Sequence, residues 1–484
     1  MAFHNARASA FLIGLLASAC LVAACSPHDA SVERGVATHD PLVTVFRADR
    51  ETAWRSFRLG GGLNVVVVSD DLPRTFAWRF QSGGISSSPT VMGTTILVSA
   101  NDHHLYAIDG VTGSLRWRYR AENEVMSQPA YANGLVYVGT GNNGDMVYDP
   151  PHFVVIGEGM NKLEAIDAAT GIEAWWSGLD GTGMPSQAII GGTIVAADGA
   201  GTVLAVDAHT GAYRWHRRLP SAFAMSSVVD GEDGRIYLSG RLENAVYALR
   251  ARDGAPAWKH RFSDLDGAIG ADPLALTPVA LVGMYLEPVA PGPRGLIVTE
   301  GARAREHVYA LDRRTGRMLW DTRLASVVGR VPRYNEAAIP AIYGGRIYIG
   351  SAVAPIVTAL DANGRVLWQT RVDGPVKGGI CARDGILYLG DLGGHLWALD
   401  ARTGRVVGST ATDMQFNTGS PIVVNDSLVI GGRSDVVALP LSAIRDSRQV
   451  AGITRLTLWE RIGRSLGRIV PQRDPHLEKS YARH

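Results

Sequence analysis

A short phrase that recurs along the chain constrains its fold more than any other feature. The phrase runs Ala, an apolar residue, Asp, two variable residues, Thr-Gly and, four positions later, an aromatic residue. Its copies have the Ala at positions 107, 165, 205, 248, 310, 359, 398 and 438, so most steps are near forty residues. A period of this length, built from strands and turns, predicts a repeat array and not one globular core.

Each copy combines strand signals with a turn signal. Upstream segments such as Ile347-Tyr348-Ile349 are typical of strands, and Gly or Asn-Gly pairs separate them as hairpin turns would. In the turn, Asp can accept hydrogen bonds from backbone N–H groups two or three residues on, and Gly can adopt the positive φ that the turn needs. The predicted turn aspartates are Asp109, Asp167, Asp207, Asp312, Asp361 and Asp400.

The aromatic residue that follows each turn is predicted to begin the next strand. From there it can pack across to the neighbouring unit, and we expect it to be buried between the two. These residues are Trp117, Trp175, Trp215, Trp258, Trp320 and Trp368.

Four antiparallel strands per unit, with units packed face to face in a ring, predict an all-β fold, an eight-bladed β-propeller over residues 76–440. The eighth unit, Pro421 to Leu439, has no Trp strand behind it. The segment Phe76 to Phe80 precedes the first complete unit and can supply that strand, which would seal the ring and remove two open edges. Seven blades is the alternative if the last unit is not a blade.

Residues 1–25 are predicted to be an export signal outside the propeller. Their apolar run, Phe11 to Ala24, is too short to span a bilayer and ends in Leu21-Val22-Ala23-Ala24-Cys25, which resembles the lipobox of bacterial lipoproteins. We therefore expect Cys25 to be lipidated and to attach the protein to a membrane. Ser26 resembles the pattern of outer-membrane lipoproteins that face the periplasm. The alternatives are Cys20 as the anchor, or an ordinary cleaved signal in which Cys25 is incidental.

Cysteine usage and composition are consistent with an exported globular chain. After an anchor at Cys25, only Cys381 would remain, so no intrachain disulfide could form. Charged residues are 19% of the chain and the net charge is +1, which gives no reason to expect a nucleic-acid partner. Residues 26–75 form a leader and N-terminal extension in this prediction.

The repeat resembles that of the quinoprotein family, which includes pyrroloquinoline quinone alcohol dehydrogenases and related non-enzymatic propellers. The resemblance covers essentially residues 76–440 and implies the fold more strongly than an activity. In the enzymes, Ca²⁺ polarises the quinone while a carboxylate takes the alcohol proton. Two residues lie where that resemblance would place them: Asn142 as a calcium ligand and Asp180 as the catalytic base. The alternative is that Asn142 caps the turn Asn142-Asn143-Gly144.

The other branch of the family lacks a cofactor site, and this chain shares more features with it. The adjacent-cysteine pair of many of the enzymes is absent, and no convincing Glu ligand precedes Asn142. A lipid-anchored propeller of this kind is similar to the lipoprotein subunit of the outer-membrane β-barrel assembly machinery. The resemblance implies a non-enzymatic scaffold that binds an envelope or outer-membrane protein, without a cofactor or metal; a pyrroloquinoline quinone- and Ca²⁺-dependent alcohol dehydrogenase is the alternative.

Three further segments depart from the repeat. Insertions at about 142–161 and 264–294 lengthen two of the steps, and they are either functional rim loops or solvated excursions. Small and Met residues before several inner strands, as in Met126-Ser127-Gln128-Pro129, could line a central channel. Residues 441–484 are a basic tail, in which a short amphipathic helix, predicted from Leu458 to Ile469, would face lipid, a partner or the propeller itself.

Overall fold

The protein divides into two compact units, Met1–Ser31 and Val32–His484, and all described residues belong to the second. The computed structural model describes residues 45–47, 58, 63–84, 87–144, 146–149, 152–223, 227–231, 233–240, 242–262, 275–276, 280–288, 304–327, 338–417, 419–447 and 472–473.

The second unit is built almost entirely from antiparallel sheets, and seven of the sheets in the described part have four strands each. These seven are β4 (Thr90–Met92), β5 (Thr95–Ala100), β6 (His104–Asp109) and β7 (Leu115–Arg120); β8 (Ala130–Ala132), β9 (Leu135–Gly139), β12 (Asn161–Asp167) and β13 (Glu173–Leu179); β14 (Ala188–Ile190), β15 (Thr193–Ala197), β16 (Thr202–Asp207) and β17 (Tyr213–Arg218); β18 (Val229–Asp230), β19 (Arg235–Gly240), β20 (Ala245–Arg250) and β21 (Pro256–Arg261); β22 (Ala275–Leu276), β23 (Ala280–Pro288), β24 (Ala304–Asp312) and β25 (Met318–Val327); β26 (Ala341–Tyr343), β27 (Arg346–Gly350), β28 (Ile356–Leu360) and β29 (Val366–Arg371); β30 (Cys381–Arg383), β31 (Ile386–Gly390), β32 (His395–Asp400) and β33 (Val406–Ala411).

One further sheet joins the two ends of the chain. Its strand order is β1 (Val45–Arg47), β2 (Val66–Val68), β34 (Ile422–Val424), β35 (Ser427–Gly431), β36 (Asp435–Pro440), β3 (Trp78–Gln81) and β37 (Gln472–Arg473). β3 pairs antiparallel with β36, and Trp78 lies opposite Ala438. This confirms the predicted closure, in which the N-terminal strand completes the last unit. We call this the closing sheet.

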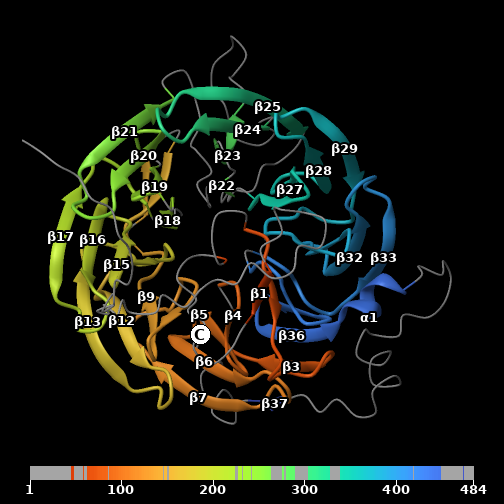
Figure 1. Ribbon diagram of the computed structural model, residues 1–484, viewed down its shortest axis with the longest axis horizontal. Helices are drawn as coiled ribbons and strands as arrows, with labels where there is room; N and C mark the ends of the chain where they lie inside the picture. The colour runs from red at the N-terminus through yellow and green to blue at the C-terminus, as the bar shows by residue number, and fades with distance from the viewer. Residues whose placement is uncertain are drawn as a thin grey trace, which may run out of the picture. The chain divides into compact units, whose positions relative to one another are not determined.

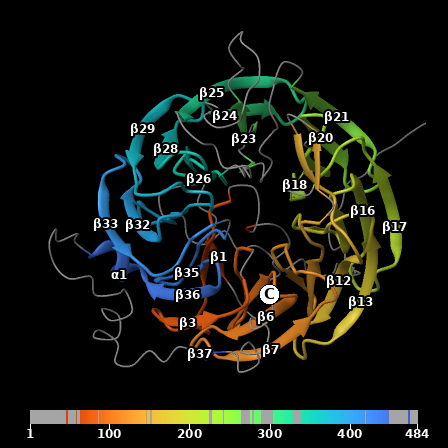
Figure 2. The same cartoon turned by 180° about the vertical axis from the view of Figure 1, so that it is seen from behind.

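The sheets follow one another around a ring within the second unit, which is the arrangement of a β-propeller (Figure 1, and from behind in Figure 2). Central strands such as β9 and β15 are buried along their whole length, because sheets cover both of their faces. Outermost strands alternate between exposed and half-buried residues, as in β29. Counting one blade for each of the seven four-stranded sheets and one for the closing sheet gives eight, and this blade count stays a prediction.

The chain enters the ring earlier than the predicted boundary at residue 76. Leu63, Val65, Val66 and Val67 are buried, with exposed fractions of 2% or less, and β2 pairs in parallel with β34. The continuous apolar run that forms β2 was a signal for a buried strand, but its lack of the repeat phrase hid its place in the sheet.

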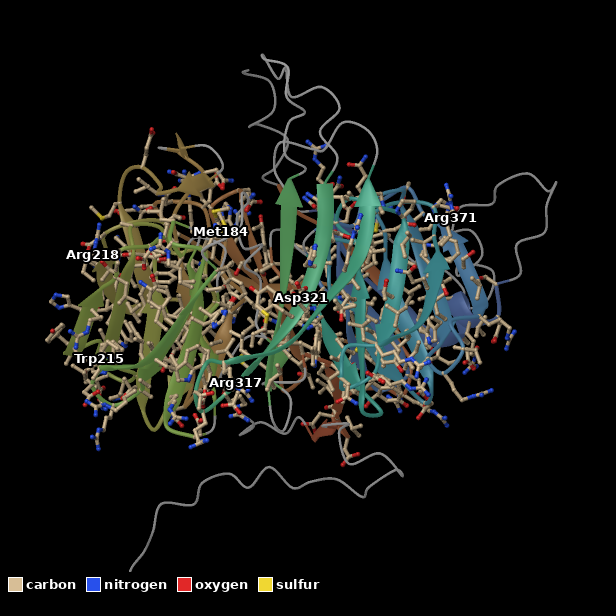
Figure 3. The ribbon with its side chains drawn as sticks, turned by 90° about the horizontal axis from the view of Figure 1, so that it is seen from above. Met184, Trp215, Arg218, Arg317, Asp321 and Arg371 are labelled. Atoms are coloured by element: carbon tan, nitrogen blue, oxygen red, sulfur yellow. The ribbon has the colours of Figure 1, made fainter. Side chains whose placement is uncertain are left out.

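The two insertions differ in the structure. Residues 142–161 contain a separate antiparallel hairpin, β10 (Met146–Asp149) and β11 (His152–Val155). The prediction of one inserted loop over 264–294 is wrong, because β22 and β23 lie inside that range and belong to a four-stranded sheet. β23, β24 and β25 have 9, 9 and 10 residues, longer than the other strands, and they rise beyond the neighbouring sheets in Figure 3.

Beyond the closing sheet, the chain forms one short helix in its described part, α1 (Leu441–Arg445), with Leu441 and Ile444 buried. The helix predicted from Leu458 to Ile469 lies outside the described residues, as do residues 1–25 with Cys25. No helix among the described residues has the length and apolarity needed to cross a membrane.

Candidate functional site

The turn aspartates organise the outer turn of each sheet. Asp109 Oδ1 accepts hydrogen bonds from the backbone N–H groups of Val111 and Thr112, at 3.0 and 2.8 Å, and from the Thr112 hydroxyl. In the equivalent turn at Asp312, the hydrogen bond from the Thr315 hydroxyl, followed by those from the backbone N–H groups of Thr315 and Arg314, holds the pKa of the carboxyl below its ordinary value. Comparable turns surround Asp167, Asp207, Asp312, Asp361 and Asp400.

The repeat tryptophans contact the turn of the next sheet. The indole N–H of Trp117 donates to the carbonyl of Ala168 at 3.0 Å, directly after the turn residue Asp167. Gly171 in the same turn has φ 73°, and a Cβ at this position would lie 2.8 Å from the Trp117 ring. The same indole-to-carbonyl bond joins Trp78 to Gly110, Trp215 to Ala251, Trp258 to Arg313, Trp320 to Ala362 and Trp368 to Ala401.

The prediction that these tryptophans are buried is wrong for most of them. Trp215 is buried, with 8% of its surface exposed. The others are only half-buried, because each lies on the outermost strand of its sheet, where the next sheet covers only one face of the indole. They are Trp117, Trp175, Trp258, Trp320 and Trp368. These contacts are structural and bring no reactive group to a ligand.

Asn142, the residue considered as a calcium ligand, uses all of its amide groups within the protein. Its Oδ1 accepts from the N–H groups of Gly144 and Glu158, at 2.9 and 2.8 Å. Its Nδ2 donates to Asn123 Oδ1 and to the Glu158 carbonyl, both at 3.0 Å. Two donors therefore occupy the oxygen that a cation would need. Asn142 caps its own turn, as in the second interpretation, and ties together the base of the hairpin β10–β11.

Asp180, the residue considered as the catalytic base, lies on the surface. Its side chain is 65% exposed, and Oδ2 accepts from the Thr202 hydroxyl at 2.6 Å and pairs with Arg218 at 3.3 Å. No hydrogen bond joins Asp180 to Asn142 in the part of the chain that the structure describes. No cluster of three or more His, Cys, Asp or Glu side chains among those residues could hold a metal ion. Asn142 and Asp180 therefore do not fit the roles of calcium ligand and catalytic base in a quinone–calcium centre.

The middle of the ring contains part of the N-terminal chain, and β1 lies within the ring in Figure 1. We call Arg58 and residues 63–69 the central segment. The Arg58 guanidinium donates through Nε to the Leu63 carbonyl at 2.7 Å and through Nη2 to the Ile380 carbonyl at 3.0 Å. Its backbone N–H donates to Gln128 Oε1 at 2.9 Å. Gln128 and Ile380 precede the innermost strands of two sheets far apart in the chain, so Arg58 bridges them.

Burial leaves Arg58 in an unusual environment. Only 1% of its surface is exposed, and burial lowers its pKa to about 10. No carboxylate among the described residues pairs with it, and Nη1 has no hydrogen-bond partner there. Sequence analysis missed this residue, because nothing in the repeat marks a position in the leader.

The small residues before the inner strands connect neighbouring sheets. The backbone N–H of Gln128 donates to Ser186 Oγ at 2.9 Å, and that of Ser186 donates to Ser227 Oγ at 3.4 Å. Equivalent bonds run from Gly379 to Ser420 and from Ser420 to Ser88. These hydroxyl groups are thus used for contacts between sheets around the centre.

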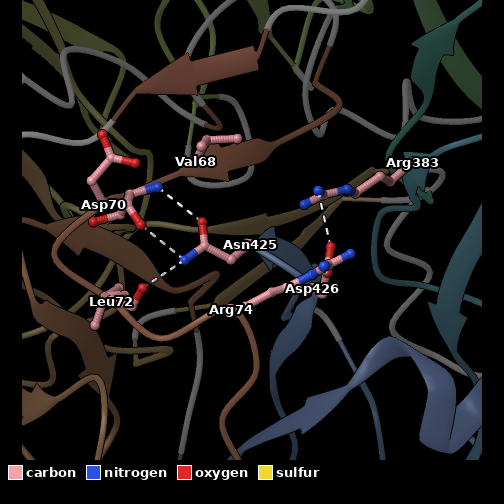
Figure 4. A pocket seen from close by; sticks show the side chains of 8 residues that line it. Val68, Asp70, Leu72, Arg74, Arg383, Asn425 and Asp426 are labelled. Atoms are coloured by element: carbon pink, nitrogen blue, oxygen red, sulfur yellow. Dashed lines mark hydrogen bonds and ion pairs between the residues drawn. The ribbon is translucent and has the colours of Figure 1, made fainter.

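A cavity of about 390 Å³ opens beside the closing sheet, where the turns β30–β31 and β34–β35 meet the chain after β2 (Figure 4). Asp426 accepts from the guanidinium groups of Arg74 and Arg383, the latter at 3.0 Å. Asn425 Nδ2 donates to the carbonyls of Ser69 and Leu72. With Asp70 on the opposite side, the wall carries two positive and two negative groups, so it favours neither an anion nor a cation.

Several buried carboxylates were missed by sequence reasoning. Asp198 accepts from the N–H groups of Asp180 and Gly181, and Asp391 accepts from that of Gly374, so each fixes the loop from the preceding sheet. The sequence did contain a signal for these two turns: in each, an Asp stands three residues before a Gly, at 198–201 and 391–394. Glu164 is a different case, since a charged residue stands where the other repeats have an uncharged Tyr, Leu, Thr, Trp or Val, and burial raises its pKa to about 7.

Comparison with known proteins places the chain in a family. The family model described as outer membrane protein assembly factor BamB matches residues 40–151, 154–278 and 304–478, which is most of the chain. The protein belongs to this family. The match begins before residue 76, as expected if the central segment is part of the fold.

Two curated relatives differ in what their names say they do. Tetrathionate hydrolase from Acidithiobacillus ferrooxidans is 24% identical over 75% of this chain and 74% of its own length. Outer membrane protein assembly factor BamB from Yersinia pestis is 23% identical over 81% of each chain.

Solved structures show the same fold in both branches of the family. BamB from Moraxella catarrhalis matches with a TM-score of 0.57 and 16% identity, covering 76% of this chain and 99% of that one. Quinohemoprotein alcohol dehydrogenase from Comamonas testosteroni matches with a TM-score of 0.58 and 14% identity, covering 84% and 83%. At these identities the likeness concerns the fold alone.

Proposed function

We propose that this protein is a lipid-anchored, non-enzymatic scaffold of the bacterial envelope that binds another envelope protein during outer-membrane protein assembly. The anchor is Cys25, and the propeller faces the periplasm. The relatives named as outer membrane protein assembly factor BamB support the assembly role and the envelope location.

The observation that carries the proposal is the occupation of the candidate centre by the chain itself. The side-chain amide of Asn142 forms hydrogen bonds with Asn123, Gly144 and Glu158. The central segment packs against inner strands in the middle of the ring. A protein that fills its own centre in this way retains its rim and its turns as binding surfaces. The hairpin β10–β11 is inserted into the repeat between β9 and β12, and it is our candidate for a partner contact.

Co-purification from membranes tests the scaffold role. The intact lipoprotein, extracted in mild detergent after chemical crosslinking, should retain an outer-membrane assembly protein, identified by mass spectrometry. Replacing residues 145–155 by a short Gly-Ser linker should weaken this recovery, while the thermal unfolding transition of the propeller is kept. A matched control is Trp176→Ser, which changes a half-exposed residue of β13, in the four-stranded sheet that the hairpin interrupts, and leaves the hairpin intact. Equal recovery from all three proteins would remove the hairpin from the proposal, and recovery of no envelope protein would contradict the scaffold role.

A second candidate, an enzyme, is favoured by one comparison, the similarity to tetrathionate hydrolase. Incubation of the purified chain with tetrathionate, followed by measurement of tetrathionate loss, separates the two. Turnover that exceeds a heat-denatured control would support a hydrolase, and no turnover across acid and neutral pH would support the scaffold.

A further inference from the structure

We propose that the central segment, Arg58 and residues 63–69, is a releasable plug: it can leave the middle of the ring while the ring stays closed. This inference goes beyond the scaffold role and does not depend on the identity of a partner.

Closure of the ring does not require the plug. β3 pairs with β36 over four residues, from Trp78 opposite Ala438 to Gln81 opposite Asp435. Trp78 is 2% exposed and its indole N–H donates to the Gly110 carbonyl of the next sheet at 2.9 Å. Asn425 additionally holds the chain at Leu72 and Pro73, after the central segment ends. Loss of β2, and of β1 that pairs with it, would leave five strands in the closing sheet: β37 and the antiparallel set β34, β35, β36 and β3, which matches the four antiparallel strands of the other seven sheets.

The plug also carries features that disfavour its own position. Arg58 and Leu63 have φ of 48° and 54°, the left-handed region that side chains rarely adopt. The guanidinium of Arg58 is buried without a carboxylate partner, and its Nη1 lacks an acceptor in the described protein. β2 pairs with β34 through only two residue pairs, Val66 with Val423 and Val67 with Val424. These costs fall within the plug, which lowers the free energy needed to release it alone.

One side chain reports on this release. Cys381 is fully buried, and its thiol donates to the carbonyl of Val65 in the plug at 2.7 Å. Burial raises its pKa to about 11, so the thiol is unreactive while the plug is seated. Departure of Val65 and Arg58 removes two of the groups next to the sulfur. Reaction of Cys381 with a thiol reagent therefore measures the open fraction.

The test uses the full chain with Cys20→Ser and Cys25→Ser, so that Cys381 is its sole cysteine. The rate of N-ethylmaleimide addition is followed by mass spectrometry, and global unfolding by far-UV circular dichroism. Val66→Asp places a charge at a position that is 2% exposed in β2, whereas the control Val68→Asp changes the half-buried end of the same strand. We expect Val66→Asp to accelerate labelling by about tenfold or more with the sheet signal retained, and Val68→Asp to change it by less than about twofold.

Labelling that occurs only at the rate of global unfolding, in the parent chain and in Val66→Asp alike, would overturn the proposal. If Val66→Asp does not fold, native-state hydrogen exchange of the parent chain decides. Faster exchange of amides in residues 64–69 than in β35 and β36 supports the plug, and equal exchange of the two regions contradicts it.

Discussion

A glycine and a tryptophan in successive repeats depend on each other. Gly171 takes a positive φ in its turn, and the absence of a side chain there admits the ring of Trp117 from the previous sheet. The Thr-Gly of each turn thus serves its own backbone and the packing of a neighbour. This double use explains why the phrase recurs as a unit along the chain.

Tryptophan truncation should expose the packing between sheets. Trp215→Ala removes a buried indole and its bond to Ala251, so we expect it to lower the free energy of unfolding by about 3 kcal/mol. Trp176→Ala removes a ring that is 50% exposed and should cost below about 1 kcal/mol. Urea denaturation compares the two, and equal losses would contradict the role given to the repeat tryptophans.

Glu164 should make stability depend on pH. The pKa of Glu164 is about 7 in the folded chain, against 4.5 in the unfolded chain. Between pH 4.5 and about pH 7, the folded state therefore keeps the carboxyl proton that the unfolded state has released. The contribution of Glu164 to stability is therefore present below pH 4.5 and is lost as pH rises to about 7. Glu164→Gln should be more stable than the parent by about 2 kcal/mol at pH 8, with a smaller difference at pH 5.5. The exposed Glu158→Gln, whose charge is not among those acting on Glu164, is the control, and a pH-independent difference would refute this assignment.

At the scale of strands and turns, the sequence predicted the elements that repeat and missed those that do not. The turn from Asp109 to Gly113 was predictable from local hydrogen bonding. The closing strand, Phe76 to Phe80, was predictable because the last repeat lacks its outer strand. The strands β22 and β23 were mistaken for a loop, because Gly, Pro and Asp around them resemble turn composition. β22 pairs with β23, and the pairing of β23 with β24 joins residues up to 32 positions apart, which a local pattern does not encode.

The hairpin β10–β11 should loosen when its base is changed. Asn142→Ala deletes four hydrogen bonds, two of them to the backbone of Glu158. Limited proteolysis should then cut within residues 145–155 several times faster, while the propeller fragments stay associated and folded. Asn143→Ala, at the exposed neighbouring position, is the matched control. Unchanged cleavage in Asn142→Ala would show that Asn142 does not hold the hairpin.

For the whole molecule, the ends of the chain determine how the ring is completed. The closing sheet receives N-terminal strands on both sides, with β2 beside β34 on its inner side and β3 beside β36. The outer strand was predictable, because an unfinished repeat requires a partner. The inner strand was not, since burial of residues 63–67 depends on the shape of the space that the ring leaves. Asn142 shows the same limit. Its neighbours in the sequence resemble those of a calcium ligand, but its hydrogen bonds are those of a residue that holds the base of the hairpin β10–β11.

The most direct test of the scaffold account is a titration of the purified chain from Ser26 onward with pyrroloquinoline quinone and Ca²⁺. Tryptophan fluorescence and thermal unfolding measure binding, and dye-linked oxidation of a panel of alcohols measures activity. The account predicts no saturable binding at micromolar quinone, no shift of the unfolding temperature and no oxidation. Micromolar or tighter binding, with alcohol oxidation that disappears in Asn142→Ala and Asp180→Ala, would contradict it and establish a dehydrogenase.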